Sequence, residues 1–84
     1  MRIIKITASW CPSCLITNDM IKDIINEYDI DLIEYDFDLD QETVSKYNPG
    51  TILPVLIKET ESGEEVSRLV GEKSKKEIIE FIEG

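Results

Sequence analysis

Apolar residues along the chain recur with two periods, a strand period of two and a helical period of about 3.6, and their alternation predicts the order of elements. The first strand-like run is apolar on both of its sides, as in a parallel strand that is covered on both faces. The second run alternates, which places Ile33, Tyr35 and Phe37 on one face. Turn residues 61–64 join the last two runs and predict a hairpin. The four predicted strands are residues 2–8, 31–37, 55–58 and 65–69.

A long helical pattern follows the first strand. Cys11 is placed to precede the helix, and Pro12 stands at the first helical position, where proline is favoured. Ile21, Ile25 and Tyr28 recur at spacings of four and three, with Ile24 beside them, and form one apolar stripe. The pattern therefore predicts a helix that runs from the cysteines to about Tyr28.

Two further helices are predicted by their caps. Asp40 is expected to cap a short helix over residues 41–47, which Asn48-Pro49-Gly50 ends. Ser74 and Glu77 form a capping box that opens the last helix. Its expected buried face carries Ile78, Ile79, Phe81 and Ile82.

The resulting order is β-α-β-α-β-β-α, which places the chain in the α/β class. The first β-α-β unit requires a parallel strand pair with a right-handed crossover, and the closing hairpin adds antiparallel strands. We therefore expect a mixed four-stranded sheet with helices on both faces. The 84 residues are enough for one domain, over residues 1–84.

The charge and hydropathy of the chain narrow the partners and the cellular location that we expect for it. Eighteen acidic residues against nine basic ones give a formal net charge of −9, which argues against nucleic acid and anionic membranes as partners. The charge is expected to keep a small monomer soluble, or else to steer it toward basic partners. No apolar run approaches membrane-spanning length, and Lys5 interrupts what would be a signal sequence. We therefore expect a cytoplasmic protein.

The candidate chemistry lies in Trp10-Cys11-Pro12-Ser13-Cys14, which holds the only two cysteines of the chain. A cytosolic C-x-x-C beside a strand–helix–strand pattern is typical of a redox dithiol. The N-terminus of a helix stabilises a thiolate, so Cys11, expected to be exposed, would attack a target disulfide. Cys14, one turn further and more buried, would resolve the mixed disulfide. Trp10 either contacts a peptide partner or packs at the sheet edge.

Three motifs in register resemble the thioredoxin superfamily, especially its small thioredoxin-like and glutaredoxin-like members. They are the W-C-P-S-C segment, Ile52-Leu53-Pro54 before the third strand, and Leu69-Val70-Gly71 before the last helix. The resemblance implies a thioredoxin-like fold, a cis Pro54 beside the cysteines, and a thiol–disulfide oxidoreductase that needs no metal or organic cofactor. It also implies protein disulfides as substrates, a thiol or reductase as electron donor, and a docking surface. That surface would comprise Trp10, Pro12, Ser13, Leu53, Pro54 and Gly71.

The chain departs from the thioredoxin pattern at three places. It opens on the first core strand, which makes its size glutaredoxin-like, and its Pro12-Ser13 dipeptide replaces Gly-Pro. Lys5 stands where thioredoxins place a buried acid, so it would either favour a thiolate by its charge or extend to the sheet edge. Gly71-Glu72 without a nearby cationic cluster argues against glutathione binding.

Two other functions use the same cysteines. A soft-metal clamp is possible for any C-x-x-C, but zinc requires four ligands and the chain has no histidine. A non-catalytic redox sensor or adaptor would have the same residues as the enzyme. The acidic segment Asp36–Asp40 begins like a calcium loop, but Gln41 and Tyr47 stand where the loop glycine and glutamate belong. These carboxylates are expected to face solvent.

Overall fold

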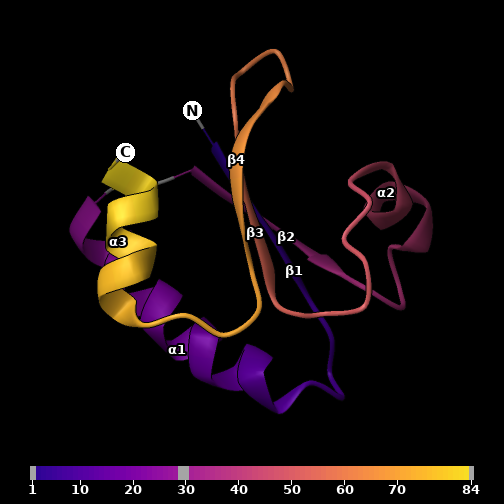
Figure 1. Cartoon of the computed structure of the whole chain (residues 1–84), viewed down its shortest axis with the longest axis horizontal. Coiled ribbons are helices and arrows are strands. Elements are labelled where there is room, and N and C mark those ends of the chain that lie inside the picture. The colour runs from indigo at the N-terminus through magenta and orange to yellow at the C-terminus, as the bar shows by residue number, and fades with distance from the viewer. Residues whose placement is uncertain (1, 29–30, 84) are drawn as a thin grey trace.

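The computed structural model describes residues 2–28 and 31–83, and its elements follow the predicted order (Figure 1). Pro12 is the first residue of the long helix, and the helix ends at Tyr28, both as predicted. The elements are β1 (Arg2–Thr7), α1 (Pro12–Tyr28), β2 (Asp31–Asp36), α2 (Gln41–Lys46), β3 (Val55–Glu59), β4 (Glu65–Val70) and α3 (Lys75–Glu83).

The strands form one mixed sheet in the order β2-β1-β3-β4. Strand β1 is central, because Ile4 pairs in parallel with Ile33 of β2 and antiparallel with Ile57 of β3. Strands β3 and β4 form the predicted antiparallel hairpin. Residues 3–7 of β1 are all buried, which agrees with a strand that is covered on both faces.

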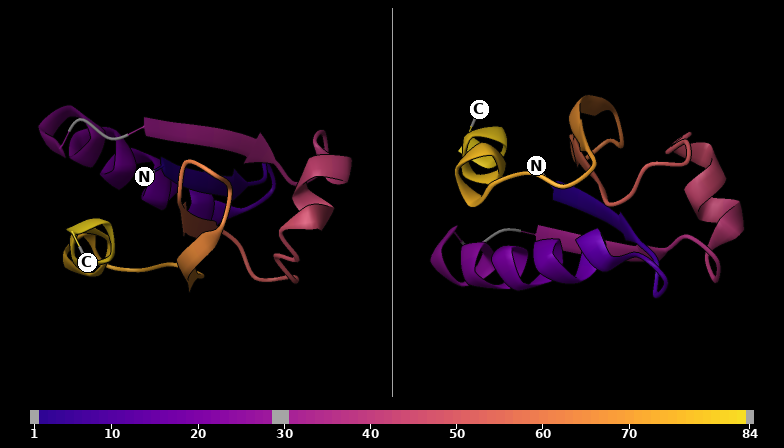
Figure 2. Two further views of the ribbon diagram at one scale, coloured as in Figure 1. Left: turned by 90° about the horizontal axis from the view of Figure 1, so that it is seen from above. Right: turned by 60° about the horizontal axis from the view of Figure 1, so that its bottom comes forward.

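Helices cover both faces of this sheet, as predicted. Helices α1 and α3 lie on one face and α2 lies on the other (Figures 1 and 2). Between the sheet and α1 and α3 is a core cluster of five buried residues: Ile3, Ile21, Ile24, Leu56 and Ile78. A second cluster on the other face contains Ile4, Ile6, Ala8, Cys11, Cys14, Val44, Leu53, Val55 and Ile57. Adjacent residues of β1 thus belong to clusters on opposite faces of the sheet, and the second cluster includes both cysteines.

The start of α2 differs from the prediction. Asp40 is the N-cap residue, but its side chain makes no capping hydrogen bond. Instead, its carboxylate accepts the backbone N–H of Asp36 at 2.8 Å, while the Asp36 carboxylate accepts the N–H groups of Asp38 and Leu39. The two carboxylates therefore organise the turn between β2 and α2, and the expectation of a side-chain cap by Asp40 was wrong.

The capping box at α3 is confirmed. The Ser74 hydroxyl accepts the Glu77 N–H at 3.2 Å, and the Glu77 carboxylate accepts the Ser74 N–H at 3.0 Å. Ile78 is completely buried. The other predicted members of the apolar face pack against the same cluster while partly exposed: Ile79, Phe81 and Ile82.

The core also holds charged side chains that hydrophobic periodicity could not place. Lys58 and Glu59 are 5% and 2% exposed. The Lys58 ammonium donates to the carbonyl of Phe81 at 3.1 Å, near the C-terminus of α3, where a cation is favourable. Glu59 forms an ion pair with Arg2 on the neighbouring strand. Each buried charge therefore has a polar partner, as burial of a charge requires.

Candidate active site

The two cysteines lie at the N-terminal end of α1, where β1 delivers the chain through a turn. The Cys11 N–H donates to the Ala8 carbonyl, and the Cys14 N–H donates to the Cys11 carbonyl, both at 3.2 Å. Both thiols are free, and Cys14 is 1% exposed. Cys11 is only 7% exposed, so the expectation of an exposed first cysteine was wrong.

The reason for the burial of Cys11 is the loop before β3. The Cys11 Sγ lies 3.7 Å from the Leu53 carbonyl oxygen, and the thiol donates a hydrogen bond to that oxygen. Leu53 and Pro54 are themselves buried, and the peptide bond between them is cis. The proline predicted by resemblance to be cis and beside the cysteines is therefore found there. A partner must approach Cys11 past this loop.

Gly71 joins the same place from the end of β4. Its N–H donates to the Pro54 carbonyl at 2.8 Å, which ties the two loops together. Its φ is 86°, in the left-handed region that glycine adopts at low cost. A Cβ added here would lie 3.3 Å from Cγ2 of Ile52. A glycine thus permits the close approach that the resemblance implies.

The two thiols have different environments. Burial, followed by hydrogen bonding to Cys11, raises the pKa of Cys14 to about 11. The Cys11 charge also raises this pKa, whereas the Ala8 backbone and the positive charge of Lys5 lower it. Cys14 is therefore a protonated thiol at neutral pH, as expected of the more buried member of the pair.

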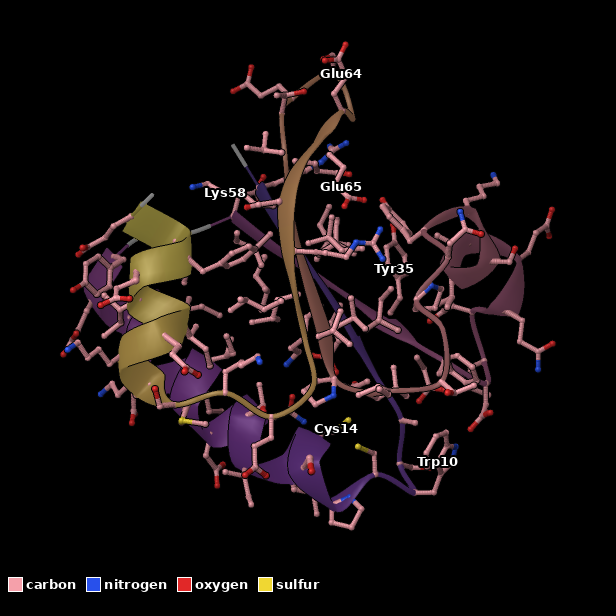
Figure 3. All side chains as sticks on the ribbon, viewed as in Figure 1. Trp10, Cys14, Tyr35, Lys58, Glu64 and Glu65 are labelled. Carbon is pink, nitrogen blue, oxygen red and sulfur yellow. The ribbon has the colours of Figure 1, made fainter. Side chains whose placement is uncertain are left out.

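Trp10 is exposed beside the pair, toward α2 (Figure 3). Its side chain is 57% exposed, and its indole N–H donates to the Asp38 carboxylate at 2.7 Å. Its ring meets Phe37 edge-on, with 6.1 Å between centroids. Trp10 thus packs against Phe37 and still leaves more than half of its surface exposed. Pro12 is exposed and Ser13 is half-buried at the first turn of α1.

Lys5 lies on β1, on the side of the sheet that α1 covers. It is 5% exposed, and its ammonium forms an ion pair with the Glu34 carboxylate at 3.0 Å. Glu34 is its register partner on the edge strand β2. The lysine thus extends toward the sheet edge yet stays buried, and its charge is paired before it reaches solvent.

Sequence reasoning did not find Asp38, Phe37 or Glu34 as neighbours of the site. Asp38 and Phe37 hold Trp10, and Glu34 holds Lys5. The only available signal for Glu34 was its place in the second strand, because a parallel register would set it opposite Lys5. That register depends on the helix that connects the strands and is not encoded in either strand alone.

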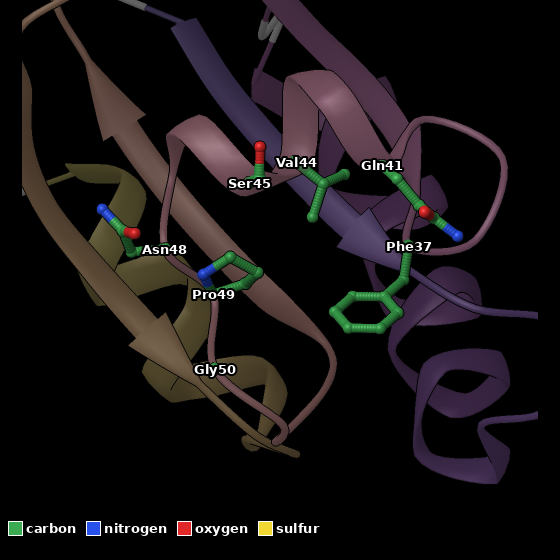
Figure 4. A pocket seen from close by; sticks show the side chains of 7 residues that line it. All are labelled: Phe37, Gln41, Val44, Ser45, Asn48, Pro49 and Gly50. Carbon is green, nitrogen blue, oxygen red and sulfur yellow. The ribbon is translucent and has the colours of Figure 1, made fainter.

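Phe37 also lines a hollow of about 440 Å³. It lies between α2 and the following loop, and Val44, Phe37 and Pro49 face it in Figure 4. Its lining has no titratable side chain, so it offers no group for thiol or acid–base chemistry.

No three His, Cys, Asp or Glu side chains lie together as a metal site within residues 2–28 and 31–83. Across the same ranges, no helix is long and apolar enough to cross a membrane. Cys11 and Cys14 are both free thiols at the start of α1.

A dithiol at the start of a helix, beside a cis-proline loop on a mixed four-stranded sheet, defines the class of thioredoxin-fold proteins. The family model described as Thioredoxin matches residues 1–84, so this chain belongs to the thioredoxin family. Family membership, together with the two neighbouring cysteines, supports a general thiol–disulfide oxidoreductase.

Known proteins agree with this assignment. A thioredoxin of Staphylococcus epidermidis is 27% identical over an alignment that covers 99% of this chain and 80% of that protein. The reduced thioredoxin preprotein of Schistosoma mansoni superposes with a TM-score of 0.85 at 28% identity, covering 96% of this chain and 74% of that one. Thioredoxin 1 of Thermosipho africanus has a TM-score of 0.85, 24% identity and coverage of 99% and 91%, and shows the shared fold.

Proposed function

We propose that this protein reduces disulfide bonds of other proteins, with Cys11 as the attacking thiol and Cys14 as the resolving thiol. The observation that carries the proposal is the inequality of the pair. Cys14 is held as a thiol by burial, which raises its pKa to about 11, whereas Cys11 lies at the helix N-terminus against the Leu53 carbonyl. Cys11 therefore attacks first, and Cys14 stays protonated until the second step.

The exchange has two steps. The Cys11 thiolate attacks one sulfur of the substrate disulfide, that bond breaks, and the first substrate cysteine leaves as a thiolate that takes up a proton. Cys14 then loses its proton and attacks the Cys11 sulfur, which releases the second substrate cysteine. The substrate has gained two electrons, and Cys11 and Cys14 are oxidised to a disulfide. A small thiol or a reductase restores the dithiol, and the sulfurs alone carry the electrons.

The proposed docking surface surrounds Cys11. Trp10 supplies exposed aromatic area, and Ile52, which is 61% exposed, supplies aliphatic area on the opposite loop. Leu53 and Pro54 are buried, so they act by shaping the loop and presenting backbone to a substrate. Pro12, Ser13 and Gly71 complete the surface. The partner is a protein segment with an accessible disulfide, met by a monomer in the cytoplasm.

Turnover of a protein disulfide tests the proposal. Reduction of a disulfide-bonded test protein by dithiothreitol should accelerate in the presence of this protein. Cys11→Ser should abolish the acceleration, and Cys14→Ser should stop the reaction after the first step. No acceleration by the folded wild type would favour the sensor or adaptor function instead.

The direction of electron flow follows from the reduction potential of the pair. A value near that of thioredoxin, about −270 mV, supports a reductant. A value near about −120 mV would make the protein an oxidant of dithiols and would overturn reduction as its role.

A further inference from the structure

The hollow of about 440 Å³ between α2 and the loop that follows it, called here the α2 hollow, has the make-up of a binding site (Figure 4). Its apolar part is formed by Phe37, Val44 and Pro49. Three exposed polar residues line it as well: Gln41, Ser45 and Asn48. Apolar walls with a few convergent polar groups are typical of the places where proteins take up part of a ligand.

The α2 hollow is continuous with the surface around Cys11. Phe37 lines the hollow and also meets the Trp10 ring, with 6.1 Å between the ring centroids. Gly50, another lining residue, lies in the loop that continues to Leu53, whose carbonyl accepts the Cys11 thiol. An extended chain advances about 3.3 Å per residue, so a segment bound at Cys11 reaches the hollow about three to five residues from its cysteine.

The charged side chains of the segments around Cys11 and the α2 hollow are all acidic. Residues 8–14, 36–45, 48–54 and 69–72 contain five acidic residues and no lysine or arginine. Asp38, Asp40 and Glu42 are exposed, and within residues 2–28 and 31–83 none of the three takes part in an ion pair. Carboxylates without a cationic partner, placed beside an apolar surface, attract a basic partner and repel an acidic one.

The occupant that these features fit is a basic segment of another protein. A second copy of this chain would bring its own net charge of −9 against the same acidic side chains. One cation contacts the lining of the hollow, because Arg68 donates to the Asn48 carbonyl at 3.3 Å. The Arg68 charge is paired with Glu65, so it leaves the carboxylates near the hollow uncompensated.

We propose that the α2 hollow, with Asp38, Asp40 and Glu42 near it, selects the substrates of this protein. It takes up an apolar side chain that lies a few residues from the substrate disulfide, in a segment that carries lysine or arginine. This inference rests on the proposed function and deepens it by naming the class of substrate.

Each part of the contact has its own role. Phe37 and Val44 remove the apolar side chain of the substrate from water. The side-chain amides of Gln41 and Asn48 offer donors and acceptors to the substrate backbone. The carboxylates increase the rate at which a basic substrate arrives, and salt screens that effect.

A series of peptides, each with one disulfide, tests the proposal. The peptides carry either lysine or glutamate beside one cysteine, and either leucine or serine at the positions about three to five residues away. The reduced protein is mixed with each peptide, the reaction is quenched in acid, and chromatography of the products gives the second-order rate constant of reduction.

Two pairs of variants separate local effects from general ones. Ser45→Phe adds a ring at the lining of the α2 hollow, and Ser62→Phe makes the same change in the turn between β3 and β4. Glu42→Lys reverses a charge three residues before Ser45 on the surface of α2, whereas Glu61→Lys makes the same change in the distant turn. Figure 3 shows that turn at the opposite end of the sheet from Cys14.

The wild type should reduce the peptide with lysine and leucine fastest. Full burial of a leucine strengthens binding about tenfold to 150-fold, and an open hollow covers only part of the side chain. Exchange of leucine for serine should therefore slow reduction about threefold to tenfold. Exchange of lysine for glutamate should slow it about 1.4-fold to fivefold for each charge, and this difference should shrink at high salt.

The variants should divide these effects. Ser45→Phe should remove the advantage of leucine, and Ser62→Phe should keep it. Glu42→Lys should reduce the advantage of lysine more than Glu61→Lys does. A leucine advantage that persists in folded Ser45→Phe would overturn the proposal, and so would equal effects of Glu42→Lys and Glu61→Lys, which would assign the preference to net charge alone.

Binding without chemistry provides a second measurement. The peptide with lysine and leucine, its cysteines replaced by serine, should shift the backbone N–H resonances of Val44, Ser45 and Asn48 in the wild type. If Ser45→Phe does not fold, as judged by circular dichroism, these shifts decide, and their absence would refute the proposal. Shifts that appear without peptide as the protein is concentrated would assign the hollow to a second copy and would also refute it.

The two proposals fail in different ways. If the wild type reduces none of the peptides but these resonances shift, the proposed function is wrong and the docking site stands. If the peptides are reduced at one rate whatever their sequence, the docking site is wrong and the proposed function stands.

Discussion

Replacing Gly71 by alanine separates the stability of the fold from the geometry of the docking surface. Gly71 has a φ of 86°, and its N–H holds the Pro54 carbonyl at 2.8 Å. Gly63, in the turn between β3 and β4, has a φ of 92° and is therefore a matched control. A Cβ on Gly63 would have Arg2 as its nearest neighbour at 3.9 Å, an ordinary contact, whereas one on Gly71 would lie 3.3 Å from Ile52.

The expected loss of stability is similar for the two variants. An alanine in the left-handed region costs about 1 to 2 kcal/mol. For a chain of this size, each kcal/mol lowers Tm by about 4 to 8 °C. The tight contact at Gly71 adds little, because Ile52 is 61% exposed and its side chain is free to move aside. Both Gly63→Ala and Gly71→Ala should therefore melt about 4 to 16 °C below the wild type.

The expected loss of activity differs. Ile52 directly precedes Leu53 and Pro54, in the loop whose Leu53 carbonyl accepts a hydrogen bond from the Cys11 thiol. A shift of Ile52 therefore changes the surface beside Cys11. The turn that holds Gly63 adjoins Glu64, at the opposite end of the sheet from Cys14 (Figure 3). Turnover of a protein disulfide, measured well below either Tm, should fall in Gly71→Ala and not in Gly63→Ala. Equal turnover in the two variants, or a Gly71→Ala protein as stable as the wild type, would refute this reasoning.

Three further predictions concern stability. Ile24→Ala should cost about 2 to 5 kcal/mol in urea unfolding, because Ile24 is completely buried, whereas Leu15→Ala, at 64% exposure on the same helix, should stay within about 0.5 kcal/mol. Ser74→Ala should cost about 1 kcal/mol through loss of the capping box, and equal stability of Ser74→Ala and the wild type would contradict that. The pKa of Cys14 is raised in the folded protein from 9.0 to about 11, so the reduced protein should lose stability as pH rises between these values. Cys14→Ser should lose less stability over this pH range than the wild type. An equal loss in the two proteins would mean that groups other than Cys14 cause it.

The order of elements could be predicted from the sequence because residues within or next to each element mark its type and its start. Pro12 marks the start of α1, and Ser74 with Glu77 marks the start of α3, through interactions that span one turn. The strands could be recognised by their period, and hairpin and crossover rules then left few arrangements of the sheet. The cysteine pair could be recognised by its spacing.

The parts that sequence reasoning missed depend on contacts between distant segments. Cys11 is buried because the Leu53 carbonyl lies over its sulfur, and no pattern around Cys11 reports that loop. The Asp40 carboxylate accepts the N–H of Asp36 instead of an N–H in the first turn of α2. The sequence alone does not decide between these two kinds of donor. The pairing of Lys5 with Glu34 depends on the strand register.

The central claim is that Cys11 attacks first and Cys14 resolves, and trapping of the mixed disulfide tests it most directly. Each single-serine variant is incubated with a protein that contains an accessible disulfide, then alkylated, digested and examined by mass spectrometry. Cys14→Ser should accumulate the substrate on Cys11, and Cys11→Ser should accumulate almost none on Cys14, whose pKa is raised to about 11 by burial. Equal trapping on both cysteines, or trapping on Cys14 alone, would contradict the account.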